Sequence, residues 1–322
     1  MNRNAHKIGI VVLNYQSASD TLACLQSIRA ALAGDSHVWV VDNASGDSSA
    51  DTLEAALAPG ESLLQSDENL GYGGGNNLGI RKALEWGADY VLVLNPDCRL
   101  EPDSLSPLII ALEAQKNAGI ACPLVLDTQT GLIQAFGGSH SLWTGRARRR
   151  YYHREPGKAR IDSWRETEYP HGTCMLLKRA FLEDVGLIHE GFFLYYEDVE
   201  LGLRARSEHW KILVIPQSRV WHADTTASRR KDALTTYHAV RNQAWVERLH
   251  AAPLQYTVFL LFSIFLRWPG KFFSRLLTGH FRASWSVVRG AFSGLFSSSH
   301  EESRHLVVFL TGRRVNPEET TY

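Results

Sequence analysis

The chain has 322 residues, of which 44% are hydrophobic and 21% are charged, with 25 glycines and 11 prolines. This composition is that of an ordinary globular protein, so it excludes disordered, collagen-like and coiled-coil chains. The length suggests two domains or one large one. Lysine plus arginine and aspartate plus glutamate number 34 each, and a net charge of zero argues against a global polyanion binder. The four cysteines form no Cys-x-x-Cys pair, which indicates neither a zinc knuckle nor a disulfide framework and favours a reducing cytoplasm.

Strand and helix patterns alternate four times over roughly the first hundred residues, as expected of an α/β sheet. The apolar, β-branched run over 8–13 predicts a buried parallel strand and is too short for a signal peptide. The further predicted elements, in chain order, are a helix from near Asp20, a strand over 38–41, a helix over about 48–57, a turn over 69–77, a helix over 78–86 and a strand over 90–94. The pattern predicts an open, mostly parallel sheet, in which ligands bind at the carboxyl ends of the strands.

Polar residues stand at three of these strand ends. Asp42 can accept a hydrogen bond from the imide N–H of uracil or thymine, or it can simply cap a helix or an Asx-turn. Asn95 and Asp97 could hold Mg²⁺ or Mn²⁺ against a diphosphate, although Asn-Pro-Asp is also good turn chemistry. One carboxylate is not a metal site. His222, which follows a predicted strand over 211–215, is a candidate second ligand because neutral imidazole also binds Mn²⁺.

A glycine-rich run over 69–77 precedes the predicted helix over 78–86. Glycines let backbone N–H groups approach phosphates, and a helix N-terminus favours anions. A dinucleotide fingerprint would need a glycine at position 76, which is Asn76, so the run argues against NAD binding. A glycine-rich surface loop is the other interpretation.

The run over 195–204 is the most informative stretch. It predicts a helix from near Glu197 to about Ser207, with three carboxylates in its first turn, where the helix dipole favours negative charge. The run describes either a well-capped helix or a carboxylate held ready to accept a proton from a hydroxyl. The aromatic residues over 192–196 either line a sugar site or belong to the core.

Two basic segments follow different patterns. Residues 141–154 hold five arginines and no acidic residue, which fits a solvated loop or a site for phosphates of a lipid or substrate. Residues 253–300 also lack acidic residues. From Lys271 onward the spacing of the basic residues predicts one amphipathic helix, with a basic face and an apolar, aromatic face suited to a membrane surface. We therefore expect residues 253–296 to bind an anionic membrane surface. The alternative is a pair of helices packed on the catalytic core or on a second subunit.

Taken in this order, the motifs resemble the family 2 glycosyltransferases, especially the rhamnosyltransferase-like branch. The runs that carry the resemblance are Val11–Tyr15, Val40–Ser45, Asn69–Asn77, Leu94–Asp97, Gly172–Leu176, Phe192–Leu201 and Trp221-His222. The resemblance implies a GT-A fold, a nucleotide-sugar donor, a divalent metal (Mg²⁺ or Mn²⁺) and an inverting mechanism.

The same resemblance assigns roles to individual residues. It implies Asp198 as the catalytic base and Asp97 with His222 as metal ligands, Asn95 replacing the first Asp of the family's D-x-D motif. His189-Glu190 stands where the family commonly has Asp-Glu. The implied donor-binding residues are Asn14, Asp42 (to the pyrimidine base), Asn43, Asn69, Gly73, Asn76 and Asn95, and the implied acceptor-binding residues are Gly172, Tyr196 and Glu197.

We therefore expect a GT-A catalytic domain over 1–232, with a nucleotide-binding half over 1–122 and an acceptor-binding half over 123–232. A helical, membrane-peripheral region is expected over 233–322. The expected reaction moves L-rhamnose from dTDP-L-rhamnose to a glycan or lipid-linked glycan in cell-surface polysaccharide synthesis, at the cytoplasmic face of the bacterial inner membrane. The alternatives are a UDP-hexose donor and a non-catalytic nucleotide-sugar-binding module. A nucleotidyltransferase is disfavoured, because it should carry a Gly-Gly-x-Gly-Thr-Arg-like loop after the first strand. No nucleic-acid partner is expected.

Overall fold

The computed structural model describes residues 6–31, 34–159, 161–223 and 232–297. Its chain divides into two compact units. The first contains residues 1–141, 146–190 and 197–227, and the second contains 142–145, 191–196 and 228–322. Short segments therefore pass from one unit to the other and back. The end of the predicted C-terminal region, 298–322, lies outside the described residues.

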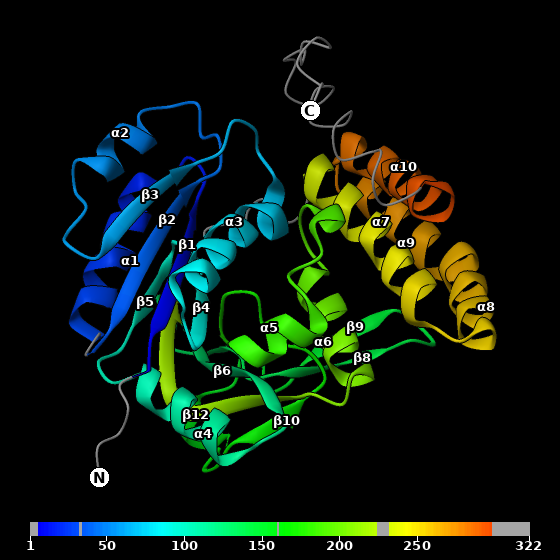
Figure 1. Cartoon of the computed structure of the whole chain (residues 1–322). Helices are drawn as coiled ribbons and strands as arrows, with labels where there is room; N and C mark the ends of the chain where they lie inside the picture. The colour runs from blue at the N-terminus through cyan, green and yellow to red at the C-terminus, as the bar shows by residue number, and fades with distance from the viewer. Residues whose placement is uncertain (1–5, 32–33, 160, 224–231, 298–322) are drawn as a thin grey trace. The chain divides into compact units, whose positions relative to one another are not determined.

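The first unit is an α/β structure (Figure 1). Its strands are β1 (Ile8–Asn14), β2 (Ser36–Asp42), β3 (Glu61–Gln65), β4 (Tyr90–Leu94), β5 (Cys98–Leu100), β6 (Ala118–Asp127), β7 (Ile133–Ala135), β8 (Gly138–Ser141), β9 (Arg146–Arg149), β10 (Arg165–Thr167), β11 (Cys174–Lys178) and β12 (Lys211–His222). Its helices are α1 (Ala18–Ala31), α2 (Ser49–Glu54), α3 (Gly71–Trp86), α4 (Leu105–Ala114), α5 (Arg179–Val185) and α6 (Glu197–Ser207), with a short 3₁₀ turn at Pro156–Lys158.

Ten of the described strands form one mixed sheet in the order β10-β12-β6-β11-β4-β1-β2-β3, with β5 on β12 and β7 on β6. The strands from β4 through β1 and β2 to β3 are all parallel, and β6 and β12 are parallel to each other. The antiparallel β11 joins these two parallel groups. The predicted open, mostly parallel sheet is confirmed.

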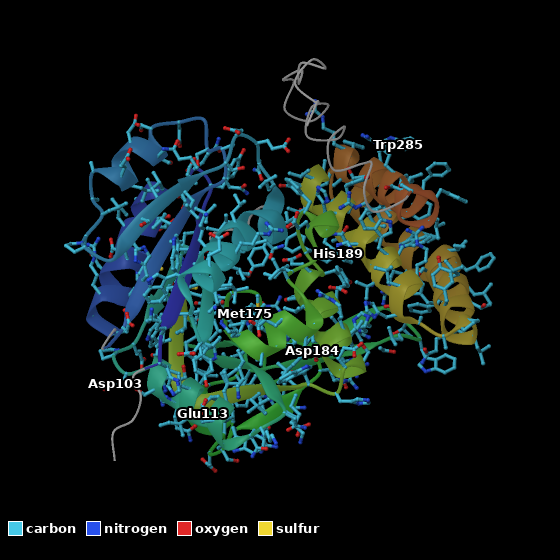
Figure 2. All side chains as sticks on the ribbon, viewed as in Figure 1. Asp103, Glu113, Met175, Asp184, His189 and Trp285 are labelled. Atoms are coloured by element: carbon cyan, nitrogen blue, oxygen red, sulfur yellow. The ribbon has the colours of Figure 1, made fainter. Side chains whose placement is uncertain are left out.

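Both faces of the sheet are buried, which explains why its strands are continuously apolar. Ile10 and Val12 of β1 pack with residues of α1 and α4 on one face, whereas Val11 packs with residues of α3, α5 and α6 on the other. Met175 of β11, labelled in Figure 2, is fully buried in the second of these clusters. This alternation fixes the register, because a slip of one residue would exchange the two faces.

The glycine-rich run is helical from Gly71 onward, so the turn predicted over 69–77 is wrong from that residue, whereas the helix predicted over 78–86 is confirmed as the later part of α3. Helix α3 already begins at Gly71. Glycine lowers helix propensity, but here its small size lets the helix lie on the sheet. A Cβ on Gly79 would come within 2.5 Å of Val11 Cγ1, and one on Gly75 within 2.4 Å of Leu13 Cδ1. Tertiary packing therefore overrides the local signal.

One strand was not predicted, and two further predicted elements need correction. Strand β3, whose residues are half-buried at the end of the sheet order, was not predicted. The strand predicted over 211–215 continues to His222, because its second half pairs with β5 and β6. The arginine-rich stretch contains strand β9, paired with β8 and exposed along its length, so it is not simply a loop.

The second unit is helical in its described part. It contains α7 (Ala233–His250), α8 (Pro253–Phe262), the π-helical segment η4 (Ser263–Arg267), α9 (Trp268–Leu277) and α10 (Phe281–Phe296). Helix α10 packs closely on α7 because Gly290 and Gly294 leave no room for a Cβ against that helix. The single amphipathic helix predicted from Lys271 onward is wrong, since α9 ends at Leu277 and α10 begins at Phe281. Gly279 lies between the two helices with a φ of +79°. No described helix has the length and apolar character needed to cross a bilayer.

Candidate active site

The ends of β1 and β2 carry a buried polar cluster. Asn14 and Asp42 are register partners, and Asn14 Nδ2 donates to Asp42 Oδ1 at 2.7 Å. The Ser45 backbone N–H donates to Asp42 Oδ2 at 3.1 Å, and the Thr21 hydroxyl donates to Asn14 Oδ1 at 2.9 Å. Asn14 is fully buried, and its hydrogen bond orients Asp42. Asp42 keeps lone pairs that could accept another hydrogen bond.

Asn43 joins the end of β2 to the start of α3. Its Nδ2 donates to Asn69 Oδ1 at 3.0 Å and to the Gly71 carbonyl at 3.1 Å, and its Oδ1 accepts from the Leu70 N–H at 3.0 Å. Asn69 in turn accepts from the Gly71 N–H at 2.9 Å. The predicted donor-binding residues Asn43 and Asn69 are thus brought together, and their contacts shape the backbone that leads into α3.

Two other predicted donor residues lie inside α3. Gly73 is buried, and a Cβ there would come within 2.9 Å of the His189 carbonyl oxygen. Asn76 is also buried; its Nδ2 donates to the Tyr72 carbonyl at 2.9 Å, whereas its Oδ1 has no hydrogen-bond partner among the described residues. Neighbouring Asn77, not predicted as a site residue, exchanges hydrogen bonds with the Ile188 backbone at 2.7 and 3.1 Å.

A carboxylate and an imidazole meet at the ends of β4 and β12. Because β5 pairs antiparallel with β12, Cys98 is the register partner of His222, which places Asp97 Oδ1 3.1 Å from His222 Nε2. Both side chains are buried. The backbone N–H of Asn95 donates to the Thr173 carbonyl at 2.9 Å, which fixes the turn before Asp97.

These donors suit a divalent cation. Ligand atoms of Asp97, Cys98 and His222 lie within 4.8 Å of one another. Burial raises the pKa of Cys98 well above its usual range, and a soft thiol suits a hard cation poorly. A carboxylate oxygen and an imidazole nitrogen remain, a set that fits Mn²⁺ or Mg²⁺ with its other positions left to waters and phosphate oxygens.

Two carboxylates stand at the start of α6. Asp198 Oδ1 accepts from the Val199 N–H at 2.8 Å, and its Oδ2 accepts from the Gly172 N–H at 3.4 Å. Burial raises the pKa of Glu197 to about 8, helped by the charge of Asp198. Burial also raises the pKa of Asp198, but these backbone N–H groups and the charge of Arg149 oppose that rise. Asp198 is therefore the carboxylate that ionises first, while Glu197 keeps its proton near neutral pH.

Tyr72 of α3 is a nearby residue that sequence reasoning did not single out. Its hydroxyl donates to the carbonyl of Gly172, whose N–H donates to Asp198. Burial and the charges of Glu197 and Asp198 raise the pKa of Tyr72 well above 10, so it remains a donor. Tyr72 stood inside the glycine-rich motif, but only the fold shows that it lies beside the acidic pair. Glu200, by contrast, forms an ion pair with Arg204 at 2.9 Å, which is a structural role.

The segment just before the acidic pair belongs to the second unit. Phe193, Tyr195 and Tyr196 all have positive φ, at 59°, 68° and 72°, which is uncommon for non-glycine residues. The carbonyls of this segment are held by α7: Asn242 Nδ2 donates to those of Phe192, Leu194 and Tyr195 at 2.7–2.8 Å. Arg241 Nη2 also donates to the carbonyls of Gly191 and Phe192, at 3.1 and 3.0 Å.

The fold is one found in glycosyltransferases. GalNAc-T7, crystallised with UDP, GalNAc and Mn²⁺, matches with a TM-score of 0.61 and 15% identity over 87% of this chain and 59% of its own. The mannosyltransferase PcManGT from Pyrobaculum calidifontis, in complex with GDP-Man and Mn²⁺, matches with a TM-score of 0.58 and 14% identity over 91% and 88%. The predicted GT-A fold is confirmed by these neighbours. The family model "Glycosyltransferase like family 2" matches residues 6–246, and the chain belongs to that family.

Relatives of the chain include rhamnosyltransferases and a hexosyltransferase. The chain is 28% identical to the N-acetylglucosaminyl-diphospho-decaprenol L-rhamnosyltransferase of Mycobacterium tuberculosis, over 77% of this chain and 88% of the relative. It is 29% identical to the low-salt glycan biosynthesis hexosyltransferase Agl10 of Haloferax volcanii, over 64% and 63%. The dTDP-rhamnosyl transferase RfbF of Shigella flexneri is 27% identical over 68% of this chain and 73% of the relative.

Proposed function

We propose that this chain is an inverting, metal-dependent glycosyltransferase that moves L-rhamnose from dTDP-L-rhamnose to a hydroxyl of a lipid-linked glycan in cell-surface polysaccharide synthesis. The observation that carries the proposal is the pairing of Asp97 with His222 at the strand ends of the same unit that presents Asp198. The Mycobacterium and Shigella relatives are both rhamnosyltransferases, which supports rhamnose as the transferred sugar. The Haloferax relative, a hexosyltransferase, keeps a UDP-hexose donor as the second candidate.

In this mechanism Asp198 acts as the general base. It removes the proton of the acceptor hydroxyl while that oxygen forms a bond to the anomeric carbon, from the face opposite the nucleoside diphosphate. The bond from the anomeric carbon to the diphosphate breaks, and the configuration inverts. Neutral Glu197 leaves Asp198 as the single charge of the pair, and Gly172 together with Val199 orients its two oxygens.

Asp97 and His222 would hold the cation, and Asp42 would accept from the base of the nucleotide. When bound, Mg²⁺ or Mn²⁺ offsets negative charge on the diphosphate. Asn43 and Asn69 would act on the donor indirectly, because their hydrogen bond shapes the backbone that leads into α3.

The activity is tested by incubating the protein and Mn²⁺ with dTDP-rhamnose, UDP-glucose or UDP-galactose and a lipid-diphosphate-linked acetylglucosamine acceptor. Asp198→Asn should lower kcat by about 10²–10⁴-fold, which is the usual contribution of general-base catalysis, and should keep donor affinity. Glu208→Gln, just beyond α6, is the matched control. Unchanged turnover in Asp198→Asn removes that residue from the role. Donor binding without any release of nucleoside diphosphate would favour a non-catalytic binding module.

We also propose that the second unit contacts the cytoplasmic face of the inner membrane. Large apolar side chains of α8, η4, α9 and α10 are exposed, among them Phe265 at 70%, Leu277 at 86% and Phe296 at 71%. Trp285 of α10, labelled in Figure 2, is exposed as well. Exposed apolar side chains on all of these helical segments favour an interaction surface. The exposed Arg282 and Arg289 on α10 add attraction to anionic lipid.

The membrane proposal is tested by sedimentation with phosphatidylglycerol and phosphatidylcholine vesicles. The double variant Phe265→Ser, Leu277→Ser should lose about 2 kcal/mol of binding, or roughly thirtyfold in vesicle affinity, because each side chain would bury part of its apolar surface in lipid. Ile110→Ser, an exposed apolar position on α4 of the first unit, is the control and should bind as the wild type does. Equal binding by all three proteins would contradict the proposal.

A further inference from the structure

His222 has a side-chain partner on the side of its ring that faces away from Asp97. Its Nδ1 lies 2.6 Å from Gln134 Oε1, while its Nε2 lies 3.1 Å from Asp97 Oδ1. Gln134 is in the middle of β7 and is buried, as His222 is. Nothing in the sequence pattern connects these two residues, which are 88 positions apart.

Asp127 decides which end of the Gln134 amide faces the imidazole. Gln134 Nε2 donates to Asp127 Oδ2 at 2.9 Å and lies 3.4 Å from the carbonyl of His222 itself. A backbone carbonyl and an ionised carboxylate both accept hydrogen bonds and donate none. A hydrogen bond from the Thr130 side chain lowers the pKa of Asp127, which keeps it ionised. The amide nitrogen of Gln134 must therefore point at Asp127, and its oxygen must point at His222.

The backbone holds this arrangement in place. Asp127 ends β6, and it is the register partner of His222 on β12. The Asp127 N–H donates to the Leu132 carbonyl at 2.9 Å, and the Thr128 N–H donates to the His222 carbonyl at 3.2 Å. The turn between β6 and β7 thus brings Gln134 back against the end of β12. The three side chains are held on paired strands, which position side chains more accurately than loops do.

Since Gln134 presents an acceptor, Nδ1 of His222 must carry a hydrogen. A neutral imidazole has one N–H, so the lone pair is left on Nε2, the atom that faces Asp97. We propose that Gln134, held by Asp127, is a positioning residue that fixes His222 in the Nδ1–H tautomer for a divalent cation bound jointly with Asp97. This inference rests on the metal site of the proposed function, and it assigns Gln134 and Asp127 a role in metal affinity.

The first test measures Mn²⁺ affinity of the full chain by electron paramagnetic resonance of free Mn²⁺, alone and with dTDP or UDP. Gln134→Leu keeps the approximate size of the side chain but removes the acceptor, and it should weaken Mn²⁺ binding 10–100-fold, as loss of such outer partners of metal-ligating histidines usually does. Gln217→Leu, on an exposed glutamine of the same strand β12, should bind as the wild type does.

The second test reads the tautomer directly. Nitrogen-15 spectra of histidine-labelled protein with Mg²⁺ and dTDP should show a protonated Nδ1 for His222, identified by the signal lost in His222→Gln. Asp127→Asn frees the Gln134 amide to turn, so it should weaken Mn²⁺ binding in the same direction; it serves if Gln134→Leu does not fold.

The outcomes separate the inference from the proposal beneath it. Wild-type Mn²⁺ affinity in a folded Gln134→Leu overturns the role of Gln134 and leaves the metal site standing. A hydrogen on Nε2 in the Mg²⁺ complex overturns the role of Gln134 and also removes His222 Nε2 from the metal ligands. A wild-type protein that binds no Mn²⁺ with either nucleotide overturns the metal site, and the inference falls with it.

Discussion

Asn242 offers the sharpest test of how α7 holds the segment that precedes the acidic pair in the chain. Its amide group is fully buried on α7, and it donates to three carbonyls of the segment over 191–196. That segment contains three non-glycine residues with positive φ and leads directly into Glu197 and Asp198. Backbone strain of this kind persists only where the surroundings hold it.

The magnitude follows from the contacts. Each buried hydrogen bond contributes about 1 kcal/mol net, and the amide has two N–H groups for the three carbonyls, so Asn242→Ala removes about 2 kcal/mol from the free energy of unfolding. The strain of three such residues is of order 1–3 kcal/mol each. Without the amide, the segment can relax to ordinary φ values, which displaces the start of α6. We expect kcat for transfer to fall about 10–100-fold, since small misplacements of a catalytic group cost this much, while donor affinity stays unchanged.

The assay compares kcat at saturating donor and acceptor with the donor dissociation constant from calorimetry, and with the urea midpoint of unfolding. Val240→Ala, which opens a cavity in the core around the same helix, is the control for a loss of about 2 kcal/mol without loss of the loop contacts. Wild-type kcat in folded Asn242→Ala would refute the reasoning, and so would an equal loss of kcat in Val240→Ala.

Three further predictions concern the first unit. Burial raises the pKa of Glu197 to about 8, so the folded state keeps a proton that the unfolded chain releases above about pH 4.3, and the free energy of unfolding falls as pH rises between these values. Glu197→Gln should therefore raise the melting temperature more at pH 8.5 than at pH 5. An equal gain at both pH values would contradict this. Gly79→Ala places a Cβ 2.5 Å from Val11 Cγ1 and should destabilise by about 1–3 kcal/mol in urea, whereas Gly157→Ala, with open space around it, should not. Activity should disappear in EDTA and return with Mn²⁺, and Asp97→Asn should need more Mn²⁺ for half-maximal rate; full activity in EDTA would argue against a metal.

The parts of the fold that were predicted from sequence are those whose signals are local. Short β-branched runs ending in polar residues identified β1, β2 and β4 together with the ligand side of the sheet. Helix α6 was predicted from Glu197 to Ser207, as observed, because its acidic first turn and basic last turn complement the helix dipole. The start of α3 was wrong because glycine propensity is a local quantity, whereas the packing of Gly75 and Gly79 on β1 is not.

The same distinction separates two kinds of residue at the candidate site. Asp97, Asp198 and His222 stand in short motifs, so the amino-acid sequence alone can point to them. Gln134 and Asn242 have no motif, because what they do depends on which carbonyl or imidazole the fold brings to them from 47 to 88 positions away. Both are buried amides that donate on one side and accept on the other, which lets them fix the direction of a neighbour's hydrogen bond. Among members of this family, differences in metal affinity or in acceptor turnover should therefore arise from substitutions at buried amides like these as well as at the motif residues.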